Sequence, residues 1–283
     1  MSHGRLADKV AIVTGGGSHP DEIGTGRATS VCLAKEGARV LIADISMENA
    51  ERTAAAIGAE GGQATVFVGD ATSEDDARAM VEAAVRTYGG LHILINNLGY
   101  RWNARGKGRR GVAEVDEAQL TEAFDLNVKT AVLASKHAIP AMFESGGGSI
   151  VNLSSCDGLA GAKHRGVPYS ISKGAMPMLT KATAAFHGRD GIRANCIAPG
   201  HLQSAYQSKI KAEERDRRRR VVPLGTEGTP WDVAWAAVFL ASDEARWISG
   251  ITLPVVLAEL RSCVLRRSNG CIGKCVLIME GVL

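Results

Sequence analysis

The sequence predicts an α/β fold in which helices cover both faces of a doubly wound, seven-stranded parallel sheet. Up to residue 256, short apolar runs rich in β-branched residues alternate with Ala-rich stretches of helical periodicity. The strand-length runs of the first half are almost wholly apolar, as expected of strands that are buried on both faces. No linker interrupts the series, which favours a single domain over residues 1–258, although 283 residues could hold two domains.

The predicted elements follow one another in a regular order. The strands cover residues 10–13, 40–43, 64–68, 93–95, 149–153, 192–197 and 251–256. The helices cover approximately residues 24–36, 47–58, 73–88, 117–144, 168–187 and 229–241. A charged stretch at 205–222 is also helical in pattern and ends in the run Arg217–Arg220. Pro177 cannot donate a hydrogen bond to the carbonyl of Lys173, which predicts a kink in the helix at 168–187. Residues 259–283 lack a clear periodicity and form an atypical C-terminal tail.

The composition is that of a globular enzyme, with 45% hydrophobic and 22% charged residues. A net charge of +3 is too close to balance to indicate a nucleic-acid or membrane partner. The N-terminus has no apolar region typical of a signal peptide, and no apolar run approaches the roughly 18 residues of a membrane span. These features predict a cytoplasmic protein whose six cysteines are reduced. Cys271 and Cys275 have no neighbouring histidine and do not predict a metal site.

A glycine-rich turn follows the first predicted strand. Gly15, Gly24 and Gly26 precede the first helix, where backbone N–H groups can approach a pyrophosphate; the alternative is a plain tight turn. Asp44 ends the second strand and is followed by Ile45, with no cation beside it. A carboxylate there can accept the ribose hydroxyls of NAD and would repel the 2′-phosphate of NADP. In the alternative interpretation, Asp44 only ends the strand or caps the next helix.

Several segments in the same order resemble the short-chain dehydrogenase/reductase family. The similarity covers residues 6–256 and rests on Thr14-Gly15…Gly24-Thr25-Gly26, Asp70, Asn96-Asn97-Leu98-Gly99, Asn127, Ser155, Tyr169, Lys173 and Pro199-Gly200. The chain departs from the family in five extra residues, 19–23, within the glycine turn, and in Leu98 and Ser204 where Ala and Thr are usual. It also reads Val256-Leu257-Ala258 where the family has Asp-Gly-Gly.

The resemblance implies a Rossmann-like fold, NAD as cofactor and a homo-oligomer, either a tetramer or a dimer. It implies a catalytic tetrad of Asn127, Ser155, Tyr169 and Lys173. The implied cofactor-binding residues are Gly15, Gly24, Gly26, Asp44, Asp70, Ala71, Asn97, Gly99, Tyr169, Lys173, Pro199, Gly200, Leu202 and Ser204.

These residues suit hydride transfer between an alcohol and a nicotinamide. Tyr169 and Lys173 are i,i+4 neighbours on one helical face. A phenol with an ordinary pKa of about 10 is a poor base, but an adjacent ammonium favours its ionised form. Ser155 can donate a hydrogen bond to the substrate oxygen. In the family, the residue equivalent to Asn127 holds a water that relays protons to the lysine. The predicted function is NAD(H)-dependent interconversion of a secondary alcohol and a ketone.

Two other functions remain open: a 3-oxoacyl thioester reductase and a non-catalytic NAD-binding scaffold. The basic loop 101–110 and the run Arg217–Arg220 follow strand ends and would attract an anionic substrate, or are simply solvated. His201 is a candidate for facing the substrate. The insertion 19–23 either bulges outwards or brings Asp21 and Glu22 near the phosphates.

Overall fold

The computed structural model describes residues 4–19, 23–100, 111–160, 166–203, 212–222 and 224–255. Seven parallel strands of these residues form one sheet in the order β3-β2-β1-β4-β5-β6-β7. This confirms the predicted fold class. The order reverses between β1 and β4, and in such sheets ligands bind at this switch point, beyond the carboxyl ends of the strands.

The bounds of the elements are close to those predicted. The strands are β1 (Val10–Thr14), β2 (Arg39–Asp44), β3 (Gln63–Val68), β4 (Ile93–Asn96), β5 (Gly148–Leu153), β6 (Ile192–Pro199) and β7 (Thr252–Val255). The α-helices are α1 (Thr25–Lys35), α2 (Met47–Ala59), α3 (Glu74–Tyr88), α4 (Glu117–Phe124), α5 (Thr130–Glu144), α6 (Val167–His187), α7 (Ala212–Val221) and α8 (Pro230–Ala241). The predicted helix at 117–144 differs in one respect, because a π-helical segment, η2 (Asp125–Lys129), separates α4 from α5.

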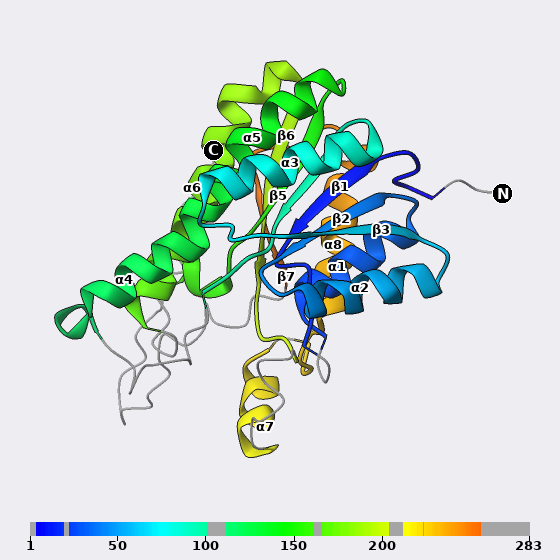
Figure 1. Ribbon diagram of the computed structural model, residues 1–283. Coiled ribbons are helices and arrows are strands. Elements are labelled where there is room, and N and C mark those ends of the chain that lie inside the picture. Colours follow the sequence, from blue (N-terminus) through cyan, green and yellow to red (C-terminus); the bar gives the residue numbers. More distant parts are fainter. Residues whose placement is uncertain are drawn as a thin grey trace, which may run out of the picture.

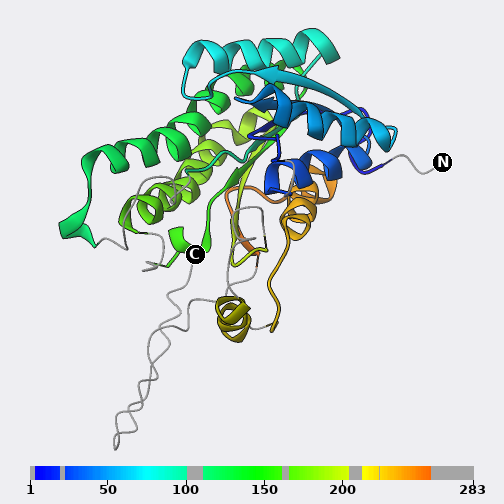
Figure 2. The same cartoon turned by 60° about the horizontal axis from the view of Figure 1, so that its bottom comes forward.

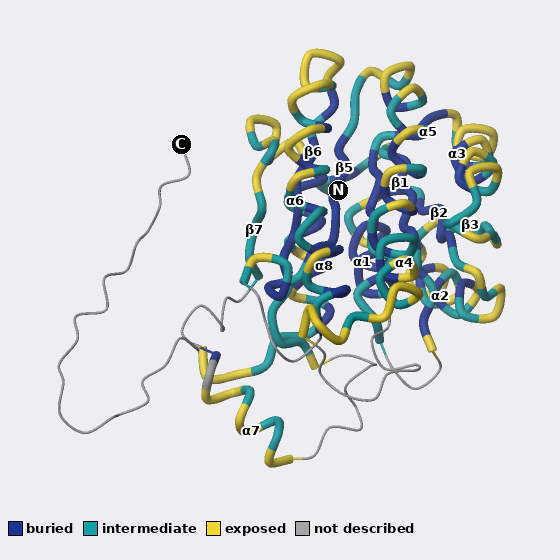
Figure 3. The backbone as a smooth tube through the Cα atoms, turned by 90° about the vertical axis from the view of Figure 1, so that its left-hand side faces the viewer, coloured by how far each residue is buried: buried dark blue, intermediate teal, exposed yellow. Residues whose placement is uncertain are grey.

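Two helical layers cover the sheet (Figure 1). One contains α1, α2 and α8, and the other contains α3, α5 and α6. Successive residues of β1 face opposite layers: Ala11 and Val13 pack in the cluster with α1 and α8, whereas Val10 and Ile12 pack in the cluster with α3 and α5. The central strands β1, β2, β4, β5 and β6 are buried over most of their length, whereas the edge strands β3 and β7 are only partly buried (Figure 3). Burial on both faces explains why β1, β2 and β4 are mainly apolar in sequence.

Helix α6 continues through Pro177 to His187, so the missing N–H does not end it; the predicted kink stays a prediction. Helix α7 lies apart from both layers, beyond the carboxyl edge of the sheet (Figures 1 and 2). None of the helices in the described part of the chain is long and apolar enough to cross a membrane.

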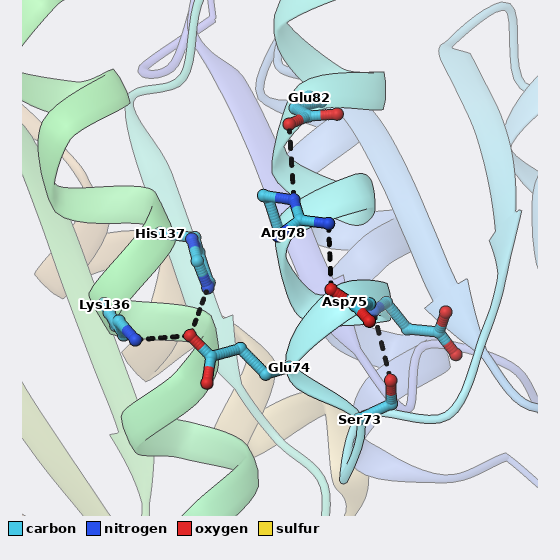
Figure 4. A network of polar contacts seen from close by, with 8 residues as sticks. Ser73, Glu74, Asp75, Arg78, Glu82, Lys136 and His137 are labelled. Atoms are coloured by element: carbon cyan, nitrogen blue, oxygen red, sulfur yellow. Dashed lines mark hydrogen bonds and ion pairs between the residues drawn. The ribbon is translucent and has the colours of Figure 1, made fainter.

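An exposed polar network joins α3 to α5 (Figure 4). Glu74, at the start of α3, contacts Lys136 and lies 3.6 Å from His137 Nε2, both on α5. The hydrogen bond from Lys136 lowers the pKa of the Glu74 carboxyl below its ordinary value. Arg78 pairs with Asp75 at 2.8 Å along α3. Because the charged groups of Glu74, Lys136, Asp75 and Arg78 are largely solvated, their ion pairs contribute little to stability, although His137 is partly buried.

His92, at the start of β4, makes folding stability depend on pH. Its Nδ1 accepts a hydrogen bond from Val10 N at 3.1 Å. Burial, aided by the charges of Lys9 and Arg39, lowers the pKa of His92 below its ordinary value of 6.5. The unfolded chain therefore binds a proton that the folded chain does not. We expect the free energy of unfolding to decrease as pH falls from about 6.5 towards the folded-state pKa, and to change no further below it.

The measurement is urea unfolding between pH 7.5 and 5 of the wild type and of His92→Asn, in which Oδ1 can replace the acceptor Nδ1. The variant should lose less stability on acidification because it carries no titrating group at this position. Identical pH dependence in both proteins would contradict the assignment.

Candidate active site

The glycine turn between β1 and α1 is shaped by close backbone contacts. Gly15 has a φ of +61°, which favours glycine. A Cβ on Gly26 would lie 2.0 Å from the carbonyl oxygen of Gly15, so this position admits only glycine without a backbone shift. Gly24 is the N-cap of α1 and carries no side-chain hydrogen bond there, and no atom of the described residues lies within 4 Å of its Cβ position. No side chain of the described residues caps the first amides of α1 at Gly24.

Asn97 fixes this turn from the end of β4. Its Nδ2 donates to the carbonyls of Thr14 (3.1 Å) and Gly15 (3.0 Å), and its Oδ1 accepts from Thr25 Oγ1 at 2.7 Å. These contacts span the switch point between β1 and β4. Asn97, predicted to bind cofactor, therefore holds the shape of the turn; direct contact with a cofactor stays a prediction.

Asp44 lies beside the same turn, at the end of β2. Its Oδ2 accepts from Gly17 N at 2.9 Å and its Oδ1 from Ser46 N at 3.0 Å, so its carboxylate is oriented by the backbone on both sides. On the next strand, Gly69 N donates to the carbonyl of Asp44 at 3.2 Å. Asp70 follows it and is exposed, with Oδ1 accepting from the backbone N–H of Thr72. Asp44 therefore lies beside the glycine turn, and Asp70 and Ala71 are the two residues that follow Gly69, which is hydrogen-bonded to Asp44.

Lys173 is held against the end of β5. Only 4% of its surface is exposed, and its Nζ donates to the carbonyl of Leu153 at 2.8 Å. A Cβ built on Gly99 would lie 3.4 Å from Lys173 Nζ and 3.6 Å from Asn127 Oδ1. Gly99, Asn127 and Lys173, predicted from three separate segments, therefore meet at one place.

Asn127 reaches this place from the π-helical segment η2. Its Oδ1 accepts from Tyr100 N at 2.9 Å, and its Nδ2 donates to Ser172 Oγ at 2.8 Å. The Ser172 hydroxyl in turn donates to the carbonyl of Tyr169. π-Helical turns are often found at functional sites because they redirect a side chain out of the regular helical register. Asn127 thus links the loop after β4 to the helix that carries Tyr169.

Tyr169 is 7% exposed and packs with Tyr100, Ala123 and Leu126 in a small apolar cluster. Sequence analysis missed Tyr100, whose only signal was its position directly after Asn96–Gly99. Its pKa is raised, chiefly by burial.

Ser155 lies two residues beyond β5. It is the N-cap of the short helix η3 (Cys156–Gly158), and its Oγ accepts from Asp157 N at 3.2 Å. Gly158 packs directly on the backbone of α6 at Lys173 and Gly174. The close contact fixes Ser155 beside the helix that carries Tyr169 and Lys173.

The segment after β6 is anchored by backbone bonds. Gly200 N donates to Val255 O, Leu202 forms a bridge with Gly228, and Gly228 N donates to His201 O. Pro199 ends β6 at the same sheet edge as Ser155. Ser204, the basic loop 101–110, Asp21 and Glu22, and the tail 259–283 lie outside the described residues.

Much of the basic run of α7 is ion-paired within the described part of the chain. Arg217 pairs with Glu214 at 2.7 Å, and Arg219 with Asp216 at 3.4 Å. Arg218 lies near Glu214 and the buried side chain of Glu227. These contacts favour the interpretation of a solvated, internally paired helix over that of an anion site. Among the residues that the structure describes, no three His, Cys, Asp or Glu side chains are grouped to hold a metal ion.

Comparison with known proteins agrees with this geometry. Residues 21–256 match the family model described as enoyl-(acyl carrier protein) reductase. The chain is 34% identical to 2,5-dichloro-2,5-cyclohexadiene-1,4-diol dehydrogenase of Sphingobium indicum, covering 89% of this chain and 96% of that protein. It is 32% identical to cyclohexanol dehydrogenase of an Acinetobacter species, covering 87% of this chain and 92% of the relative.

A crystal structure from Burkholderia xenovorans, described as a short-chain dehydrogenase/reductase, has the same fold. It superposes with a TM-score of 0.81 at 33% identity, covering 89% of this chain and 96% of the other.

Proposed function

Since the chain belongs to the short-chain dehydrogenase/reductase family, we propose that it interconverts a secondary alcohol and a ketone with NAD(H). The observation that carries the proposal is the meeting of Asn127 and Lys173 beside Gly99, with Tyr169 one helical turn away on α6. Lys173 is buried there with its Nζ fixed by Leu153 O. A buried cation next to a phenol and an open glycine turn is suited to proton and hydride transfer.

In the proposed reaction, Tyr169 Oη takes the proton of the alcohol hydroxyl as the carbinol hydride departs. The positive charge of Lys173 supports loss of the phenolic proton, and Ser155 Oγ donates a hydrogen bond to the substrate oxygen. Asn127 Oδ1 has a second lone pair beyond its bond to Tyr100 N. That lone pair can accept a hydrogen bond from a water molecule, and this water could relay protons between Lys173 and the solvent. In the reduction direction, neutral Tyr169 returns the proton to the developing alkoxide.

The glycine turn fits the pyrophosphate of a dinucleotide. The first backbone N–H groups of α1 are donors that no described side chain caps. No atom of the other described residues lies within 4 Å of the Cβ position of Gly24. Asp44 would hold the adenosine ribose, Asp70 and Ala71 the adenine side, Lys173 the nicotinamide ribose, and Pro199 to Ser204 the carboxamide. NAD, when bound, supplies the hydride acceptor.

Asp44 is proposed to select NAD over NADP. Asp44→Asn keeps one acceptor oxygen, for Gly17 N or for Ser46 N but not for both, and removes the charge that opposes a 2′-phosphate. One charge at about 4 Å is worth about 1–4 kcal/mol, so the ratio of NADP to NAD affinity should rise about tenfold or more. Fluorescence titration with both reduced cofactors measures this ratio. The control is Asp75→Asn, an exposed carboxylate on α3, which should leave the ratio unchanged; an unchanged ratio in Asp44→Asn would remove Asp44 from the ribose site.

The substrate is proposed to be a cyclic secondary alcohol. The apolar cluster of Tyr100, Ala123 and Leu126 beside Tyr169 suits an apolar ring, and two relatives are named for cyclic alcohols. An acyl thioester reductase is the second candidate, because the matching family model is described as an acyl-carrier-protein reductase.

A screen for NADH formation over cyclic, steroid and hydroxyacyl alcohols separates the two. Oxidation of cyclic alcohols with NAD supports the proposal. Turnover confined to acyl thioesters with NADPH would replace it with the second candidate, and NAD binding without any turnover would indicate a scaffold.

We also propose that the chain self-associates. Ile171, Met178 and Phe186 of α6 are large apolar side chains exposed by 45%, 65% and 81%, more than a lone subunit usually leaves on one helix. Sedimentation should give a dimer or tetramer, and Met178→Glu with Phe186→Glu should shift the distribution towards monomer. A wild-type monomer at micromolar concentration would contradict this.

A further inference from the structure

Lys173 is held at both of its ends by two consecutive residues at the end of β5. Leu153 O accepts from its Nζ at 2.8 Å, and Ser154 Oγ donates to its backbone carbonyl at 2.7 Å. Ser154 and Lys173 are each 4% exposed. The next residue along the chain is Ser155. A single strand end therefore fixes the lysine and carries the serine of the proposed site.

The carbonyl of Lys173 needs such a donor because of the helix sequence. In an α-helix this carbonyl would accept from the N–H of the residue four positions later. That residue is Pro177, which has no N–H. A buried carbonyl without a donor is unfavourable. The Ser154 hydroxyl thus takes the place of the hydrogen bond that Pro177 removes from α6.

Two neighbouring contacts fix the position of the Ser154 hydroxyl relative to the Lys173 carbonyl. Ser154 N donates to Ile197 O at 2.8 Å, which extends the pairing of β5 with β6 and fixes the serine backbone. On the other side, a Cβ on Gly158 would lie between 2.6 and 2.8 Å from the Lys173 carbonyl carbon and oxygen and from Gly174 N. The backbones of η3 and α6 are therefore in contact at the same carbonyl.

We propose that Ser154 is a positioning residue, whose hydroxyl donates to the Lys173 carbonyl in place of the N–H that Pro177 lacks and so sets the lysine relative to Tyr169 and Ser155. The inference rests on the proposed function, because its effect is on the chemistry that Lys173 supports. Ser154 touches neither substrate nor cofactor in this account. It acts by fixing the turn of α6 that carries the lysine.

The chain offers a way to restore the missing bond from the opposite side. In Pro177→Ala, the new N–H of residue 177 can donate to the Lys173 carbonyl within the helix. The test compares the wild type, Ser154→Ala, Pro177→Ala and the double variant. The matched control is Ser149→Ala, because Ser149 Oγ of the same strand donates at 3.0 Å to a helix carbonyl, that of Leu240 in α8, at the other end of β5.

Ser154→Ala should lower kcat for NAD-dependent alcohol oxidation by about tenfold and displace the pH dependence of kcat, with KM for NAD changed by less than about threefold. The double variant should recover kcat to within about threefold of the wild type and restore the pH profile. Ser149→Ala should lose thermal stability comparably but keep its kcat and pH profile. This pattern distinguishes a positioning role of Ser154 towards Lys173 from a general loss of stability caused by removing a buried hydrogen bond.

Wild-type kcat or an unshifted pH profile in Ser154→Ala would overturn the inference, as would a double variant no more active than Ser154→Ala. If Ser154→Ala does not fold, the double variant is compared with Pro177→Ala instead. Both contain the N–H of residue 177, which can donate to the Lys173 carbonyl, so we expect them to have equal kcat; a lower kcat in the double variant would overturn the inference. Failure of the proposed function is distinct: it would appear as no NAD-linked turnover by the wild type, or as full turnover by Tyr169→Phe.

Discussion

Tyr169→Phe should lower kcat for alcohol oxidation by a factor of about 10²–10⁴, the usual contribution of a general acid–base group. The substitution removes the atom that we propose exchanges a proton with the substrate, and it keeps the ring that packs with Tyr100 and Ala123. The fold and the glycine turn between β1 and α1 should therefore be unaffected. NADH binding, measured by fluorescence, should change by less than about threefold, because this hydroxyl is only one of many proposed cofactor contacts.

Tyr88→Phe is the matched control. Tyr88 ends α3, its ring lies 5.7 Å from the Arg39 guanidinium, and its buried hydroxyl has no hydrogen-bond partner in the described part of the chain. Loss of that hydroxyl should leave kcat unchanged. If Tyr169→Phe retained wild-type kcat at every pH, Tyr169 would not be the acid–base group and the mechanism would have to be abandoned.

Gly26→Ala should weaken cofactor binding strongly. Its new Cβ would meet the carbonyl oxygen of Gly15 at 2.0 Å and Asn97 Nδ2 at 2.7 Å, and the first of these is backbone that cannot rotate away. Overpacking of this kind costs about 1–3 kcal/mol. If the turn distorts to relieve it, the same energy is lost from binding, and the Kd for NADH should rise about 10- to 100-fold.

Gly58→Ala provides the comparison. Gly58 lies within α2, and no other described residue outside its own helical turn lies within 4 Å of its Cβ position. Alanine should therefore stabilise the helix by about 0.5–1 kcal/mol and leave the Kd unchanged. Titration and thermal unfolding of both variants give the two quantities. Wild-type affinity in a folded Gly26→Ala protein would show that the turn does not hold the pyrophosphate.

The sequence pattern predicted the sheet well because the central strands are buried on two faces and the helices that cover them are buried on one. Continuous apolar runs such as Val10–Val13 have few other stable placements, so the seven strands appear close to their predicted bounds. The motif residues Asn127 and Lys173 were also predicted, and the structure brings them together at Gly99. Gly99 and Leu153 lie at or just beyond the ends of the neighbouring strands β4 and β5, on one sheet edge. Helical segments η2 and α6 bring Asn127 and Lys173 to that edge.

What the sequence did not predict depends on contacts between distant segments. The π-helical turn at Asn127 and the packing of Tyr100 on Tyr169 have no local signature. The Ser154 bond joins residues 19 apart in the chain. Similarly, Arg193 is an unexpected residue in a buried strand, and its guanidinium donates to the carbonyls of Leu240 and Ser242 at the end of α8. Burial lowers the pKa of Arg193. The carbonyl acceptors that compensate for the burial of its guanidinium come together only in the folded protein.

Transfer of a labelled hydride tests the central claim most directly. Secondary alcohols deuterated at the carbinol carbon, cyclohexanol among them, would be incubated with the protein and NAD, and the cofactor analysed by mass spectrometry. We predict a ketone product and one deuterium in the reduced nicotinamide, at a rate that falls with Tyr169→Phe. Unlabelled cofactor after ketone formation, or no oxidation of any alcohol by protein saturated with NAD, would contradict the account.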